Sequence, residues 1–199
     1  MNPSLSVMLA TVLVAGWGLA GCSTPVGDVG NGVPSLEQIA ADARSRGHDW
    51  QAEQLDDGNI TLAEFDEGHR RNLACLNDSG ISYSAPTRNV VDGYDWLYDM
   101  HWSGLKDSEG QRLSQGCFDA NLGELSIAMS EWGEWETEPA LMVAVVRCVN
   151  NKGIELTSEA KNLRDLQKEG ADQGLTKEGI STCVQVEMQR LHPGVAYAL

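Results

Sequence analysis

Four aromatic side chains fall on even-numbered positions of one short segment: Tyr94, Trp96, Tyr98 and Trp102. This alternation predicts a strand with the aromatic rings on one face and Asp95 and Asp99 on the other. Aromatic faces stack on sugar rings, so the segment is a candidate carbohydrate-binding platform. A pair of carboxylates flanking a glycosidic bond would instead indicate a glycan hydrolase. Alternate aromatics on a strand also serve as cross-strand packing, and the sequence leaves that interpretation open.

The histidines follow no catalytic spacing. The chain contains no H-E-x-x-H motif and no nucleophile motif around its four histidines. His69 falls on an apolar helix face, which favours a packing role. His101 would share a strand face with Asp99, which is typical of a surface ion pair. We therefore assign no catalytic residue.

The segment from Asp57 to Glu64 resembles the second half of a calcium-binding EF-hand loop. Gly58 would be loop position six and Glu64 position twelve. The first half does not fit, because position three would be Leu55, which cannot bind a cation. A helix cap explains the same residues without metal. We expect no metal site and no cofactor.

Four cysteines follow residue 70, and they are expected to form two disulfides: Cys75, Cys117, Cys148 and Cys183. An even number of cysteines in an exported chain is typical of a disulfide framework, and four cysteines allow three pairings. The segments 75–81 and 148–154 share Cys, Asn, Gly and Ile, and each is followed by one further cysteine. This internal similarity favours Cys75–Cys117 and Cys148–Cys183. A zinc site would need closely spaced pairs such as C-x-x-C, which the sequence lacks.

The N-terminus has the pattern of an export signal. Residues 1–21 contain no charged side chain, and residues 7–20 form an apolar run that is shorter than the roughly 20 residues of a membrane-spanning helix. The run ends in Leu19-Ala20-Gly21-Cys22, which resembles the lipobox of bacterial lipoproteins. That resemblance implies cleavage before Cys22 and attachment of a diacylglycerol, with acyl chains such as palmitate, to its sulfur through a thioether, and two chains anchor a protein firmly. The alternative is an ordinary secretory peptide.

The rest of the chain reads as a tether followed by one domain. Residues 22–34 are rich in Gly, Pro, Ser and Thr, which is typical of a flexible linker, and residues 35–199 form the domain. Thr61 and Glu64 predict a capping box for a helix that ends at Gly80. Further helices are predicted over five ranges: 36–46, 118–132, 139–149, 159–170 and 176–191.

The predicted fold class is α+β, mainly helical, with a small antiparallel hairpin and two disulfides. The hairpin should turn at Asp92-Gly93 and return in one strand from Tyr94 to Trp102. We expect the helix over 118–132 to cover its aromatic face. We expect the residues from Leu156 to Glu159 to cap the helix over 159–170.

The composition excludes some partners. The chain has 199 residues and a formal net charge of −15, whereas binding to nucleic acid needs clustered Lys and Arg. The same negative charge disfavours electrostatic binding to anionic lipid.

A longer pattern runs through the predicted domain: W-Q-A-E-x-L-x-D-G-x-I-T-x-x-E-F from Trp50, C-L-x-x-x-G-I from Cys75, an aromatic strand, Cys117-Phe118, and a second C-x-x-x-x-G-I from Cys148. It resembles a group of small envelope lipoproteins of high-GC Gram-positive bacteria. The resemblance implies a location at the outer face of the cell membrane, but it supplies no catalytic residues. The expected role is non-enzymatic binding or scaffolding, with envelope proteins or cell-wall glycan as partners. A glycan hydrolase or carbohydrate-binding module is the alternative.

Overall fold

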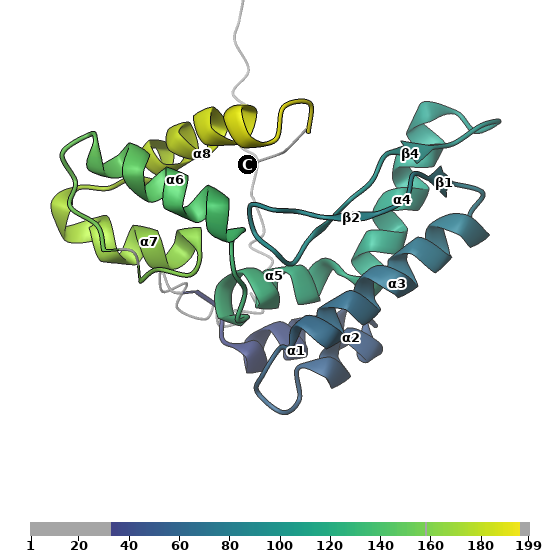
Figure 1. Cartoon of the computed structure of the whole chain (residues 1–199). Coiled ribbons are helices and arrows are strands. Elements are labelled where there is room, and N and C mark those ends of the chain that lie inside the picture. The colour runs from purple at the N-terminus through teal and green to yellow at the C-terminus, as the bar shows by residue number, and fades with distance from the viewer. Residues whose placement is uncertain (1–32, 158, 196–199) are drawn as a thin grey trace, which may run out of the picture. The chain divides into compact units, whose positions relative to one another are not determined.

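The computed structural model describes residues 33–157 and 159–195. The predicted signal peptide, Cys22 and most of the tether lie outside this part. The described part is mainly helical (Figure 1). Its α-helices are α1 (Leu36–Ser45), α2 (Asp49–Gln54), α3 (Leu62–Asp78), α4 (Asp107–Asn121), α5 (Gly123–Trp132), α6 (Pro139–Asn150), α7 (Leu163–Gly170) and α8 (Lys177–Leu191). Its strands are β1 (Ser82–Tyr83), β2 (Thr87–Arg88), β3 (Trp96–Leu97) and β4 (Met100–His101), and a short 3-10 helix, η1 (Ala171–Gln173), follows α7.

Helix α3 begins and ends as its sequence predicts. The Thr61 hydroxyl accepts a hydrogen bond from the backbone N–H of Glu64, and the Glu64 carboxylate accepts one from the Thr61 backbone at 2.8 Å. Gly80 has a φ of +78°, the left-handed conformation that glycine adopts most readily. Phe65 on this helix is fully buried. The capping box and the glycine stop are therefore confirmed.

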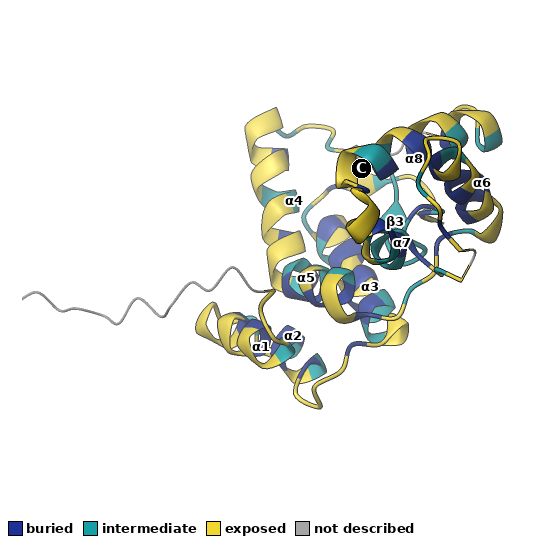
Figure 2. Cartoon of the chain, turned by 90° about the vertical axis from the view of Figure 1, so that its left-hand side faces the viewer, coloured by how far each residue is buried: buried dark blue, intermediate teal, exposed yellow. Residues whose placement is uncertain are grey.

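Four of the first five helices share one core. Side chains from α1, α2, α3 and α5 form this cluster, which has Phe65, Leu125 and Met129 at its centre. Helix α4 packs against α3 but buries only Gly110 and Cys117, so its outer face is exposed (Figure 2).

The predicted helix over 118–132 is interrupted at Leu122. Helix α4 ends at Asn121 and α5 begins at Gly123. The interruption packs against Gly68 of α3, where an added Cβ would lie 3.0 Å from the Asn121 carbonyl oxygen and from a Leu122 methyl. Helix α5 packs against α1 and α3, and Tyr94 packs against the core to which α5 contributes. Phe118 and Tyr98 line one shared hollow. The expected cover of the aromatic residues by this segment is therefore present in part.

The last three helices form a second core. Leu141, Val145, Leu166, Val184 and Met188 are fully buried in it. The predicted helix over 139–149 is confirmed as α6, with Pro139 in its first turn. Helix α7 starts later than predicted, because the Asn162 side chain and not the segment at 156–159 caps it.

Both predicted disulfides are confirmed. Cys75–Cys117 joins α3 to α4, and Cys148–Cys183 joins α6 to α8. The first disulfide lies in a third, smaller cluster with Leu73, Leu76 and Ile81, and the second lies in the core of the last three helices.

The hairpin is present but more broken than predicted. Strand β2 pairs antiparallel with β3, with Arg88 opposite Trp96, and β1 pairs antiparallel with β4, with Ser82 opposite His101. The predicted single return strand from Tyr94 to Trp102 is thus two short strands that belong to different sheets. The aromatic side chains consequently do not share one strand face.

Candidate functional site

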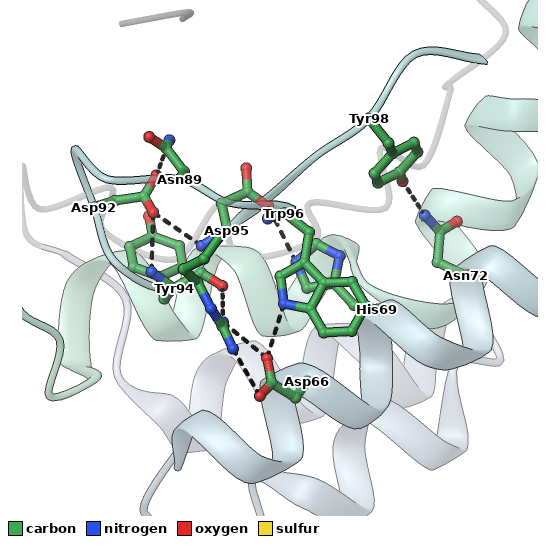
Figure 3. Close-up of polar contacts among 10 residues, drawn as sticks. Asp66, His69, Asn72, Asn89, Asp92, Tyr94, Asp95, Trp96 and Tyr98 are labelled. Atoms are coloured by element: carbon green, nitrogen blue, oxygen red, sulfur yellow. Dashed lines mark hydrogen bonds and ion pairs between the residues drawn. The ribbon is translucent and has the colours of Figure 1, made fainter. Parts of the chain in front are cut away.

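Tyr94, Trp96 and Tyr98 of the predicted aromatic segment lie along α3, and their side chains point toward that helix (Figure 3). The His69 ring is stacked on the Trp96 indole with 5.1 Å between centroids, and it meets the edge of Phe65 at 4.8 Å. His69 is 1% exposed. Its Nε2 lies 3.0 Å from an Asp95 carboxylate oxygen, but neither ring nitrogen makes an aligned hydrogen bond to a described residue.

A bidentate ion pair holds the hairpin on the same helix. The Arg88 guanidinium donates to both carboxylate oxygens of Asp66 at 2.8 and 2.9 Å. The Trp96 indole N–H donates to the same carboxylate at 3.1 Å. Arg88 also donates to the Tyr94 carbonyl at 2.6 Å. The planar fork of Arg suits this geometry, and it fixes the hairpin relative to α3.

Asp92 organises the turn of the hairpin. One of its carboxylate oxygens accepts from the backbone N–H groups of Tyr94 and Asp95 at 3.0 and 2.9 Å. The other accepts from the Asn89 amide at 2.6 Å. Burial raises the pKa of the Asp92 carboxyl because it disfavours the charged form, although these hydrogen bonds act in the opposite direction.

The two tyrosines are phenols kept in their neutral form by their surroundings. Burial raises the pKa of Tyr94, whose ring packs between Phe65 and Trp135. Burial also raises the pKa of Tyr98, whose hydroxyl accepts a hydrogen bond from Asn72 at 2.9 Å. Neither phenol is placed to act as a base near neutral pH.

The structure divides the four predicted aromatic residues between two clusters of buried side chains. Tyr94 packs against the core of α1, α2, α3 and α5, whereas Trp96, Tyr98 and Trp102 pack against a smaller cluster of Leu73, Leu76, Ile81 and Cys117. Trp102 also covers Gly110 of α4, where an added Cβ would lie 2.5 Å from the indole. The Trp102 indole N–H donates to Asp107 at 3.3 Å.

The partners on α3 are Asp66, His69 and Asn72, which sequence reasoning did not connect to the aromatic segment. Their spacing of three residues places them along one side of the helix, and that spacing was the available signal. Because the Trp96 ring already stacks on His69, this arrangement attaches the hairpin to α3 more directly than it offers a free surface to a ligand.

The EF-hand-like segment uses its carboxylates locally. Asp57 accepts from the backbone N–H of Asn59 at 3.0 Å, and Glu64 completes the cap of α3. Within residues 33–157 and 159–195, no three His, Cys, Asp or Glu side chains gather as a metal site.

Two hollows lie near the Arg164 side chain. The larger has a volume of about 540 Å³ and is lined by Trp135 and by the carboxylates of Glu134, Glu136 and Asp165. A smaller one of about 290 Å³ lies among α5, α7 and α8.

Within the described residues, no helix is long and apolar enough to span a membrane.

No family of known proteins, no curated protein and no solved structure matches this chain.

Proposed function

We propose that the protein is a lipid-anchored lipoprotein of the bacterial cell envelope whose role is binding or scaffolding. The observation that carries the proposal is the pairing of the cysteines. The chain has five, and two disulfides use the four that follow residue 70. Disulfides persist in oxidising, extracytoplasmic compartments, and this pairing leaves Cys22 without a partner in the chain. An unpaired cysteine directly after an apolar leader suits lipidation.

The build of the domain supports a scaffolding role. Disulfides crosslink α3 to α4 and α6 to α8, and the hairpin is fixed to α3 by the Arg88–Asp66 pair. The Thr137 hydroxyl donates to the Val91 carbonyl at 2.7 Å, which ties the hairpin turn to the start of α6. These constraints favour a rigid body that presents surfaces to partners at the outer face of the membrane.

Intact-mass analysis of the protein purified from a high-GC Gram-positive host tests the anchor. We expect a mature chain that starts at Cys22 and carries a diacylglyceryl group in place of the thiol hydrogen. A Cys22→Ser variant should lack that mass. An unmodified Cys22 in the wild-type protein, or four free thiols after alkylation under native conditions, would overturn the proposal.

Glycan binding or hydrolysis is the second candidate, and the larger hollow favours it. Trp135 supplies an indole, and Glu134, Glu136 and Asp165 supply carboxylates to one space of about 540 Å³. Glu136 also pairs with Lys161 at 3.5 Å. Release of soluble glycan from purified cell wall, lost in Glu134→Gln or Asp165→Asn, would establish hydrolysis. Wall that remains intact, together with a wild-type chain that sediments with it, would establish binding alone.

A further inference from the structure

The smaller hollow has the build of a ligand site with an apolar floor. Its floor is formed by Leu163 of α7 and by Ile180 and Val184 of α8. Ile180 and Val184 are 5% and 0% exposed, so the floor is continuous with the core of the last three helices. A volume of about 290 Å³ corresponds to roughly ten liquid water molecules, which suits a ligand of about eight non-hydrogen atoms.

The rim of this hollow has a local net charge opposite in sign to that of the whole chain. Two cationic side chains, Arg164 and Lys177, line it together with one carboxylate, Glu131. The local balance is positive, although the chain as a whole carries a formal net charge of −15. An anionic group should therefore bind more favourably at this hollow than at most other places on the protein surface.

Arg164 is fixed in place without being neutralised by a close carboxylate. Its guanidinium donates to the carbonyls of Ser130, Glu131 and Gly133 at the end of α5, at 3.2, 2.7 and 3.1 Å. Among the described residues, the nearest carboxylate oxygen is that of Asp165, 4.0 Å from the Arg164 Nε. Its positive charge is thus held rigidly at the hollow.

Lys177 is free to reach a ligand. Its ammonium makes no hydrogen bond or ion pair with any residue that the structure describes. The adjacent carboxylate, Glu178, is exposed, and its pKa is lowered mainly by its own backbone N–H and by the Thr176 side chain, with a smaller effect of the Lys177 charge. A mobile ammonium beside an apolar floor can close over an anionic head group.

We propose that this hollow binds a small amphiphile with one anionic group, a carboxylate on a short alkyl chain or ring. The apolar part lies on Leu163, Ile180 and Val184, and the carboxylate meets Lys177 and Arg164. This inference does not depend on the lipid anchor, so the two can fail separately.

Methyl NMR of the full chain in phosphatidylcholine nanodiscs tests the site, with hexanoate as the probe and hexanamide as its neutral counterpart. We expect hexanoate to shift the Ile180 methyl signal saturably with a roughly millimolar midpoint, and to leave that of Ile127 on α5 unchanged. Hexanamide should bind at least about fivefold more weakly, because it lacks the charge.

Two variants and their matched controls complete the test. Lys177→Gln should weaken hexanoate about fivefold to tenfold, whereas Lys152→Gln, outside the hollow, should not. Ser181→Phe fills the hollow and should abolish the Ile180 shift, whereas Thr182→Phe, exposed on the same helix, should retain it. An unmoved Ile180 signal, equal binding of hexanamide, or full binding by Ser181→Phe would each overturn the proposal.

Discussion

The buried Gln51 side chain provides the most direct test of how the interruption between α4 and α5 is stabilised. Gln51 on α2 is 0% exposed. Its amide nitrogen donates to the Asp119 carbonyl at 2.7 Å. Its amide oxygen accepts from the backbone N–H groups of Glu124 and Leu125 at 2.9 and 3.3 Å. One side chain thus satisfies the end of α4 and the start of α5.

Replacing Gln51 by Leu keeps the volume similar and removes all three hydrogen bonds. Two N–H groups would lose their shared acceptor in a buried place, and each unsatisfied group costs about 1–3 kcal/mol. The Asp119 carbonyl belongs to an exposed residue, so water can replace its lost donor. The buried Leu side chain offsets part of the loss, by roughly 1–2 kcal/mol. We expect the free energy of unfolding to fall by about 2 kcal/mol.

Urea unfolding followed by tryptophan fluorescence, with the disulfides intact, measures this loss. Gln54→Leu is the matched control, because it makes the same substitution one turn later on α2. The Gln54 amide has only a 3.4 Å contact with the Trp50 carbonyl. We expect Gln54→Leu to lie within about 0.5 kcal/mol of the wild type. A Gln51→Leu variant no less stable than Gln54→Leu would refute the role assigned to Gln51.

Three further predictions concern the second disulfide, the buried phenol and the hairpin turn. The double variant Cys148→Ala/Cys183→Ala opens a crosslink with a sequence separation of 35 and should lose about 4 kcal/mol by the chain-entropy estimate, measured as a shift of the urea midpoint under non-reducing conditions. An unchanged midpoint would contradict this. Because the folded pKa of Tyr94 is raised above its usual 10.0, its stabilising effect is full below that pH and is lost as the pH rises toward the folded pKa. Tyr94→Phe should therefore flatten the fall of the urea midpoint between pH about 9 and about 11, and an unchanged slope would contradict this. Gly93→Ala should destabilise the protein in thermal unfolding by at least about 2 kcal/mol more than Gly47→Ala. Both glycines have positive φ, but only a Cβ at Gly93 would overlap the Glu136 carbonyl. Equal losses of stability in the two variants would exclude that overlap.

The sequence by itself determined the features that depend on residues close together in the chain. Thr61 and Glu64 are three residues apart, so the groups that cap α3 meet as soon as one helical turn forms. The same applies to Ser35 and Gln38 at the start of α1. The disulfide pairing was predictable despite its longer range, because two similar segments each carried one cysteine and were each followed by another.

The tertiary structure alone decided the contacts between distant segments. The Gln51 amide reaches backbone groups 73 and 74 residues away, and no local rule distinguishes it from the exposed glutamines. The aromatic segment has a clear strand alternation, yet it divides between two sheets, and Trp96 and Tyr98 contact separate residues on α3, His69 and Asn72. Backbone caps are set by the geometry of one helical turn, whereas these contacts depend on which helix faces become neighbours once the apolar side chains have found a common core.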